Sequence, residues 1–334
     1  MKITQSARLK GHNTMGIDAV ADCLVEWNSP EELRCILDDL ERPLLAIGQG
    51  SNLVFMDDFH GTVLVSAIRD IEVIGQDSGS VLVKVGSGYV WDDFVTYSVL
   101  NGWWGVENLA AIPGQVGASA VQNIGAYGQE SSDCIETVLA VSLEDGSMRE
   151  FSKEECRYAY RQSIFKNELK GRYAISHVIF RLGLKPAPKL SYGNLAQKVE
   201  ALGGPTLKNI SEAVRDIRAE KLPDPAVLGN AGSFFMNPVI PLSQYRDLLK
   251  TFPDMPSYPA ADGGMIKVPA GWLIEHAGWK GRSMGPAAVY ERQALVLVNK
   301  GGATGADILA LANAITDSVK EKYGILLNPE ANLI

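Results

Sequence analysis

The sequence has 334 residues, of which 46% are hydrophobic and 21% charged, and its formal net charge is -8. These values are typical of a globular protein of about two domains, and they exclude disordered, fibrous and membrane-spanning classes. The acidic excess argues against nucleic acid as a partner. No segment has the apolar core of a signal peptide or a membrane helix, which predicts a cytoplasmic protein without membrane attachment.

Glycine is over-represented, with 33 residues against a typical share of about 7%. So much glycine without a collagen-like repeat indicates tight turns, or backbone that approaches a ligand closely. The four cysteines and four histidines are scattered along the chain. Their spacing predicts neither a disulfide framework nor a metal site.

The first two regions of the chain carry most of the strand signals. Residues 1–66 combine a helix-like stretch with two apolar runs, at 29–40, 44–47 and 62–65, which predicts a small α/β unit. From residue 67 onward period-two patterns predict strands at 81–85, 138–143 and 174–182. Asp145-Gly146 predicts a hairpin turn between the last two strands, and a helix is expected over 91–100.

Beyond residue 186 the pattern favours helices. Ile210, Val214 and Ile217 share one helical face, and further helices are expected over 269–279 and 307–323, the last ended by Gly324. Strands are predicted at 295–299 and 325–327. Because the strands are joined mostly by hairpins and do not alternate regularly with helices, the sequence predicts the α+β class.

The first glycine cluster, Gly48-Gln49-Gly50-Ser51-Asn52-Leu53, directly follows a predicted strand. Its glycines let the backbone turn sharply and expose N–H groups, while Ser51 and Asn52 add side-chain donors, as in nests that bind diphosphates. It is not a Rossmann fingerprint, because it lacks the third glycine and a following helix. A plain tight turn is the alternative interpretation.

A second, longer cluster runs from Pro113 to Gly128 and contains four glycines and no charged residue. Such a small and neutral segment suits backbone packed against a large flat ligand. A buried crossover on the sheet would give the same pattern. Two glycine clusters flanked by strands together favour a dinucleotide ligand.

The two clusters resemble the FAD-binding signatures of the UDP-N-acetylenolpyruvoylglucosamine reductase family, which serves peptidoglycan precursor synthesis. The resemblance continues in chain order through Tyr160-Arg161-Gln162-Ser163-Ile164-Phe165-Lys166, Lys221-Leu222-Pro223-Asp224-Pro225, Gly229-Asn230-Ala231-Gly232-Ser233-Phe234-Phe235 and Pro329-Glu330. It implies the vanillyl-alcohol-oxidase/PCMH-type FAD-binding fold of two α+β subdomains, here at 1–66 and 67–215. A C-terminal α+β substrate-binding domain is expected at 216–324, with 325–334 returning to the first subdomain.

The resemblance implies an NADPH-dependent flavoenzyme with non-covalent FAD, which reduces UDP-N-acetyl-3-O-(1-carboxyvinyl)-glucosamine to UDP-N-acetylmuramate. A hydride would pass from FAD N5 to the vinyl carbon, and Ser233 would donate the proton. Arg161 and Glu330 would stabilise the enolate formed between these steps. The residues alone leave alternatives open. Ser233 suits a helix cap or turn, Arg161 suits either a two-pronged contact with a carboxylate or a surface ion pair, and a lone glutamate such as Glu330 is usually exposed.

The resemblance also assigns binding residues. The expected cofactor-binding residues are Gly48, Gln49, Gly50, Ser51, Asn52, Leu53, Pro113, Gly114, Gly117, Ala118, Ser119, Gln122, Asn123, Gly125, Ala126 and Tyr127. The expected substrate-binding residues are Tyr192, Arg218, Lys221, Asn237 and Gln293. Tyr192 matches the loop tyrosine of the first of the family's two types, and for Arg218 a solvated helix end is the alternative. Met236 stands where the family commonly has a lysine.

Two other functions are compatible with the residues. One is an alcohol or hydroxy-acid oxidase of the same flavin fold, which would often hold its flavin covalently. The other is a non-catalytic UDP-sugar-binding module in which the glycine clusters are only structural. The chain is expected to act as a monomer on small-molecule partners, namely NADPH and the UDP-sugar enolpyruvyl ether.

Overall fold

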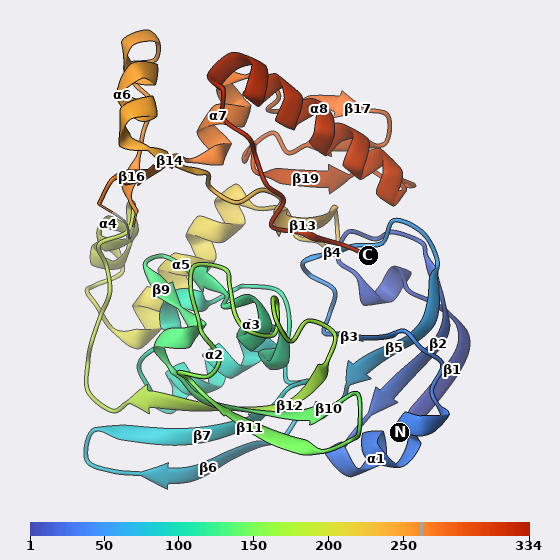
Figure 1. Ribbon diagram of the computed structural model, residues 1–334. Helices are drawn as coiled ribbons and strands as arrows, with labels where there is room; N and C mark the ends of the chain where they lie inside the picture. The colour runs from blue at the N-terminus through green and yellow to red at the C-terminus, as the bar shows by residue number, and fades with distance from the viewer. Residues whose placement is uncertain (261–262) are drawn as a thin grey trace. The chain divides into compact units, whose positions relative to one another are not determined.

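A computed structural model describes residues 1–260 and 263–334, and the chain forms two compact units (Figure 1). Unit 1 contains residues 1–7, 20–49 and 59–219. Unit 2 contains residues 8–19, 50–58 and 220–334. Each unit is therefore assembled from three separate stretches of the chain.

Unit 1 contains a four-stranded sheet in the order β1-β2-β5-β3. Its strands are β1 (Lys2–Arg8), β2 (Val20–Trp27), β5 (Phe59–Ser66) and β3 (Leu44–Ile47), and β5 pairs in parallel with both β2 and β3. The helix α1 (Pro30–Ile36) begins after Ser29, whose side chain accepts a hydrogen bond from Glu32 N. Such an N-cap satisfies one of the N–H groups that a helix start leaves without a partner. The short 3-10 helix η2 (Leu37–Asp39) follows α1.

The larger sheet of unit 1 is antiparallel and has the order β11-β10-β12-β7-β6. Its strands are β6 (Ile71–Gln76), β7 (Ser80–Gly86), β10 (Ile135–Ser142), β11 (Met148–Ser152) and β12 (Tyr173–Gly183). The helices α2 (Trp91–Leu100), α3 (Val116–Gln122) and α5 (Leu207–Lys221) share one buried core with this sheet, as Figure 1 shows. Trp91, Phe94 and Phe180 lie at its centre, with ring centroids 4.7 to 6.0 Å apart. Unit 1 also contains η3 (Glu107–Leu109), β8 (Gly125–Ala126), β9 (Gln129–Glu130), η4 (Ser131–Asp133) and α4 (Leu195–Ala201).

Unit 2 contains a sheet of order β13-β19-β18-β17. Its strands are β13 (Gly229–Ser233), β17 (Ser283–Met284), β18 (Ala287–Val289) and β19 (Val296–Asn299). The helices α7 (Ala270–His276) and α8 (Gly305–Tyr323) accompany this sheet. The helix α8 begins with a capping box formed by Thr304 and Asp307 and ends at Gly324, which has the left-handed conformation typical of a helix stop.

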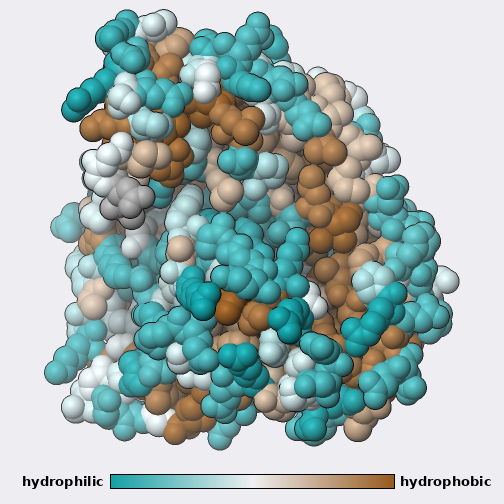
Figure 2. Space-filling view, viewed as in Figure 1, coloured by the Kyte–Doolittle hydropathy of each residue, from teal (hydrophilic) through white to brown (hydrophobic). Residues whose placement is uncertain are grey.

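Several smaller elements complete the described part of unit 2. The strands β14 (Val239–Pro241), β16 (Met265–Lys267) and β15 (Tyr258–Pro259) form a three-stranded sheet next to α6 (Leu242–Thr251). No residue of α6 is buried, and Figure 2 shows apolar side chains along this helix and at its base. The strand β20 (Asn332–Leu333) pairs in parallel with β4 (Leu53–Val54), and the 3-10 helix η1 (Lys10–His12) lies in the first stretch of the unit.

Most predicted elements are confirmed, including the helices over 91–100 and 307–323 and the strands at 81–85 and 138–143. The predicted strand at 325–327 is wrong, since the only strand of the described chain after α8 is β20. The turn at Asp145-Gly146 joins β10 to β11 rather than to β12, which pairs with the other edge of β10. Within the described residues no helix is long and apolar enough to cross a membrane.

Candidate active site

The two glycine clusters meet inside unit 1. Gly114 N donates a hydrogen bond to Gln49 Oε1 at 3.1 Å, across 65 residues of sequence. A Cβ added to Gly48 would lie 3.2 Å from Gln115 Oε1 and 3.4 Å from the Ala118 Cβ. A side chain at position 48 would therefore press against the side chains of Gln115 and Ala118. The sequence-based inference that both clusters belong to one site is therefore supported by contacts.

The second cluster forms a short helix, α3, that packs tightly on the sheet. Gly117 N donates to Ser87 O at 3.0 Å, and a Cβ at Gly117 would lie 2.7 Å from the Ser87 Cβ. The Gln115 Nε2 and Ser119 Oγ donors bond to main-chain carbonyls of unit 1. These two side chains therefore bond to the protein itself.

Burial divides the expected cofactor residues into two groups. Gly50, Gly114, Gly117, Ser119 and Asn123 are buried. Solvent still reaches Gly48, Gln49, Ser51, Asn52, Leu53, Pro113, Ala118, Gln122, Gly125, Ala126 and Tyr127. The second group supplies the surface that a ligand could touch, while the first shapes the backbone beneath it.

Arg161 lies in unit 1, on the turn that precedes Ser163. Its backbone is left-handed, with φ of 57°. Its guanidinium donates to Gly125 O at 2.5 Å and to Asn123 O at 3.3 Å, and it lies over the Tyr160 ring at 5.2 Å. Arg161 is thus joined to the second glycine cluster.

Ser233 and Glu330 lie on adjacent chain segments of unit 2. Ser233 ends β13, where the pairing with β19 is irregular between Asn230 and Ser233. Glu330 N donates to Phe234 O at 2.7 Å, and Phe235 and Pro329 form an antiparallel bridge. The backbone therefore holds Glu330 beside the residue that follows Ser233, and both side chains are half-exposed.

The first glycine cluster also reaches this part of unit 2. Asn52 Nδ2 donates to Glu330 O at 3.1 Å, and Asn332 N donates to Asn52 O at 2.9 Å. Gly50 is left-handed, with φ of 65°, and a Cβ there would collide with the His12 carbonyl. Position 50 must therefore be glycine, because a side chain there would block the close approach of this segment, which carries Asn52, to the His12 carbonyl.

The expected substrate residues have different surroundings. In unit 1, Tyr192 is 48% exposed and its ring packs edge-on against Tyr127, with centroids 5.9 Å apart. Arg218 is half-buried and its Nε donates to Ala111 O at 3.1 Å, so it is not a solvated helix end. Burial lowers the pKa of Arg218, although a guanidinium stays protonated in proteins.

The other three expected substrate residues lie in unit 2. Lys221 is exposed at the end of α5. Asn237 Oδ1 accepts a hydrogen bond from Ala270 N, the first residue of α7, at 2.9 Å. A Cβ at Gly271 would lie 3.1 Å from Gln293 Oε1. Asn237 and Gln293 therefore both lie at the beginning of α7.

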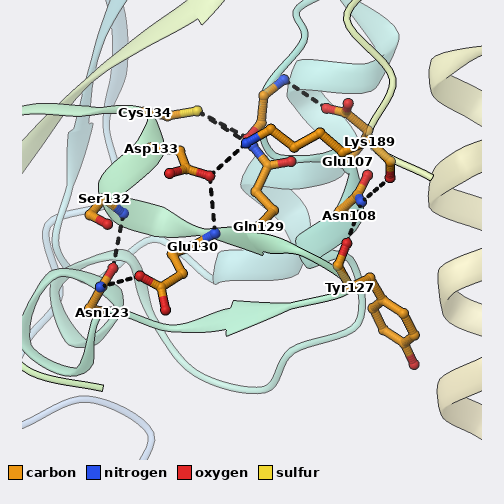
Figure 3. Close-up of polar contacts among 11 residues, drawn as sticks. Glu107, Asn108, Asn123, Tyr127, Gln129, Glu130, Ser132, Asp133, Cys134 and Lys189 are labelled. Carbon is orange, nitrogen blue, oxygen red and sulfur yellow. Dashed lines mark hydrogen bonds and ion pairs between the residues drawn. The ribbon is translucent and has the colours of Figure 1, made fainter. Parts of the chain in front are cut away.

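Sequence reasoning missed a buried polar cluster beside the second glycine cluster, drawn in Figure 3. Glu107 is 1% exposed, accepts from Gly105 N at 2.7 Å, and has its pKa raised by burial. Asn108 Nδ2 donates to Tyr127 O at 2.8 Å and to Lys189 O at 2.7 Å. The signal that could have revealed it is a glutamate and an asparagine inside the otherwise apolar stretch before Pro113.

Family models match two parts of the chain. Residues 21–152 match an FAD-binding domain, and residues 224–334 match the C-terminal domain of UDP-N-acetylenolpyruvoylglucosamine reductase. A protein of that name from Bacteroides fragilis is 48% identical over 332 residues, which cover 99% of both chains. The chain belongs to the UDP-N-acetylenolpyruvoylglucosamine reductase family. The expectation from the sequence motifs is thereby confirmed.

Other members of the reductase family extend the comparison. The Porphyromonas gingivalis protein is 49% identical over 338 residues and the Pseudomonas aeruginosa protein 44% identical over 338, with 99% or more of each chain covered. The crystal structure of the reductase from Thermus caldophilus covers 99% of this chain and 98% of its own, with a TM-score of 0.69 at 23% identity. It shares the fold, which confirms the predicted FAD-binding architecture with its additional C-terminal domain.

Membership of the reductase family makes the chain an FAD-containing oxidoreductase. The alternative functions of a covalent-flavin alcohol oxidase and a non-catalytic binding module are set aside. The residues present also fit the cofactor. A Cβ at Gly117 would lie 2.7 Å from the Ser87 Cβ, so this position has no room for a side chain. The buried Gln122 Oε1 has no hydrogen-bond partner within the described residues. An acceptor left in this state indicates a missing donor.

Proposed function

We propose that this chain uses NADPH to reduce UDP-N-acetyl-3-O-(1-carboxyvinyl)-glucosamine to UDP-N-acetylmuramate. Bound FAD, held without a covalent link by the two glycine clusters, would supply the hydride chemistry. The family of the chain and the names of its relatives support this reaction. We further propose that the chain is divided into two FAD-binding subdomains, 1–66 and 67–215, and a substrate-binding domain, 216–324. The strands of each of the three main sheets lie within one of these ranges.

The reaction adds a hydride and a proton across one carbon–carbon double bond. When the hydride reaches the terminal vinyl carbon, negative charge develops on the neighbouring carbon and spreads into the carboxylate. Such charge needs a fixed cation and a proton donor. We assign the cation to Arg161 and the proton to the Ser233 hydroxyl, which is acidic enough to protonate a strongly basic enolate carbon. Glu330 would help to stabilise the enolate.

The observation that carries the proposal is the placement of Ser233 and Glu330. Their chain segments are far apart in sequence, yet the bond from Glu330 N to Phe234 O aligns them within unit 2. A structural role alone does not require a serine and a glutamate at these two half-exposed positions. Two polar groups with different proton affinities, fixed on neighbouring chain segments, suit proton delivery and charge stabilisation.

Binding of the sugar nucleotide is assigned to Tyr192, Arg218, Lys221, Asn237 and Gln293. Arg218 and Lys221 carry the positive charge that a diphosphate requires, and Tyr192 offers an exposed ring. Met236 supplies no charge, so no ionic contact is assigned at that position. Monomeric state and a cytoplasmic location stay predictions.

The test separates the two half-reactions. Ser233→Ala should allow NADPH to bleach the flavin at the wild-type rate, while reoxidation by the enolpyruvyl substrate slows by orders of magnitude. Ser243→Ala is the control, because Ser243 is an exposed serine on α6. Wild-type reoxidation in Ser233→Ala would overturn the role of Ser233. Absence of flavin absorbance in the purified and FAD-reconstituted chain would overturn the proposed reaction.

A further inference from the structure

The turn that carries Arg161 is closed by its own backbone. Ala159 N donates to Gln162 O at 3.2 Å, and Gln162 N donates to Ala159 O at 2.9 Å. These two bonds place Arg161 at the tip of the turn, where its left-handed φ of 57° carries strain for a side chain of this size. A strained tip persists only when its surroundings hold it. The turn therefore needs external anchors.

Two anchors join the turn to the end of α3. Ser163 Oγ donates to Val121 O at 2.7 Å, and Asn123 Nδ2 donates to Ala159 O at 2.9 Å. The Arg161 guanidinium adds the contacts to Asn123 O and Gly125 O. Asn123 therefore makes two contacts here. Its side chain bonds to the base of the turn, and its carbonyl accepts a hydrogen bond from the Arg161 guanidinium.

The side chain of Asn123 is buried and bonded within unit 1. It is 0% exposed, and Nδ2 also donates to Glu130 Oε2 at 2.8 Å, so both donor hydrogens are used. Oδ1 accepts from Ser132 N at 3.0 Å. Ser131 Oγ lies 3.3 Å from Oδ1, although its single proton also has Ser119 O within 3.0 Å. Figure 3 shows Asn123 between Glu130 and Ser132.

We propose that Asn123 is a positioning residue for Arg161 and that its side chain does not bind FAD. The inference rests on the proposed role of Arg161 in the reduction. The residue is suited to this position because asparagine tolerates the left-handed φ of 46° that ends α3. By fixing Ala159 O and presenting its own carbonyl, Asn123 sets where the Arg161 guanidinium lies. A shift of about 1 Å in such a group can cost roughly 100-fold in rate.

The experiment uses the FAD-loaded full chain carrying Asn123→Asp. Aspartate keeps the shape and the backbone conformation but replaces the donor that serves Ala159 O and Glu130 with an oxygen. We expect FAD affinity and the rate of flavin reduction by NADPH to stay within about threefold of wild type. Reoxidation by the enolpyruvyl substrate should slow by roughly tenfold to 100-fold. Asn101→Asp is the matched control, since Asn101 is an exposed asparagine that ends α2.

A double-mutant cycle with Arg161→Ala tests whether Asn123 acts through Arg161 or independently of it. If Asn123 acts through Arg161, Asn123→Asp should have almost no further effect on reoxidation in the Arg161→Ala background. Additive effects, or a loss of FAD binding in Asn123→Asp, would overturn the positioning role. Wild-type reoxidation in Arg161→Ala alone would instead overturn the proposed function of Arg161.

Two further variants keep the inference testable if Asn123→Asp does not fold. Asn123→Gly preserves the left-handed backbone and removes the amide, and Ser163→Ala removes the second anchor of the turn. Both should slow reoxidation more than flavin reduction. Equal slowing of the two half-reactions in both variants would show that the site as a whole is disturbed and would contradict a specific action on Arg161.

Discussion

Gln49 Oε1 accepts a hydrogen bond from Gly114 N, and this single side chain links two glycine clusters separated by 65 residues. Gln49 extends from the end of β3, whereas Gly114 lies just before α3. The link fixes the spacing between the two pieces of backbone expected to hold the cofactor. It therefore provides a direct way to loosen the cofactor site without touching the proposed catalytic residues.

Replacing Gln49 with leucine should weaken FAD binding. Loss of the bond costs about 1 kcal/mol, which corresponds to roughly a fivefold rise in Kd if the cost falls on the bound state. The measurement is flavin fluorescence during titration of the apoprotein with FAD. Gln49→Glu keeps an acceptor oxygen for Gly114 N and serves as the control. Equal Kd values for the two variants would contradict the role of the bond.

Gly125→Ala should displace Arg161. An added Cβ would lie 2.8 Å from Arg161 Nη1 and 2.9 Å from Gln129 O. Since the carbonyl cannot move easily, we expect the guanidinium to shift and substrate-dependent flavin reoxidation to slow at least tenfold. Gly75→Ala is the control, because its Cβ would meet only the Leu82 side chain at ordinary distances. Stopped-flow absorbance of the flavin measures both variants, and equal rates would refute the expected displacement.

Asn52→Asp should loosen the segment that carries Glu330. The substitution removes the donor that reaches Glu330 O and puts a carboxylate oxygen beside that carbonyl. The Asn332 amide, which donates to Asn52 O, should then exchange with solvent roughly tenfold faster, as expected for a loss of about 1.4 kcal/mol in local stability. Hydrogen exchange detects this directly, and unchanged protection of Asn332 would oppose it. Asn209→Asp, at a half-buried position of unit 1, should leave it unchanged.

His177 should make stability depend on pH. It is 7% exposed, and burial lowers its pKa from 6.5 against the opposing effect of Asp70, whose carboxylate lies 3.3 Å away. Lys84 also lowers this pKa and Glu31 raises it. Below about pH 6.5 the unfolded chain therefore binds a proton that the folded chain resists, so stability falls with decreasing pH until the folded pKa is passed.

The measurement is urea unfolding between pH 7.5 and pH 5 for the wild type and His177→Gln. Glutamine keeps a donor towards Asp70 but does not titrate. The wild type should lose more unfolding free energy than His177→Gln over this range. His60→Gln, at a side chain that is 84% exposed, should follow the wild type. Parallel curves for the wild type and His177→Gln would show that His177 does not contribute.

The spacing of apolar residues predicted a helix or strand correctly where the buried side chains repeat with the period of that element. The helix α2 matches the predicted range because its apolar residues repeat with helical spacing and Asn101-Gly102 ends it. The same logic failed at 325–327. Ile325 and Leu327 are buried and Leu326 is 55% exposed, so the alternation of a strand is present. No strand of the described chain pairs with it, and alternation alone does not make a strand.

The sequence supplied candidate site residues but did not predict the contacts around them. Family motifs pointed to Arg161, Ser233 and Glu330, whereas the bonds that orient them join distant parts of the chain. Asn123 and Ala159 are 36 residues apart, and nothing in either neighbourhood indicates the other. The helix α3 was missed because Gly117, Ser119 and the β-branched Val116 and Val121 have lower helical propensity than alanine. It forms because Val116 and Ala120 are buried in the core of unit 1.

The parallel pairing of β20 with β4 has a consequence for the order in which the protein folds. Residues 8–19 and 50–58 leave the ribosome early, but their partners in unit 2 lie between 220 and 334. Contacts of such high sequence separation form slowly, and during synthesis they cannot form at all until the partner exists. Unit 1 can fold once residue 219 has left the ribosome, because its three stretches all end at or before that residue. The segment with Asn52 must wait for residues 330–334, so the proposed site is assembled only after unit 1 can fold.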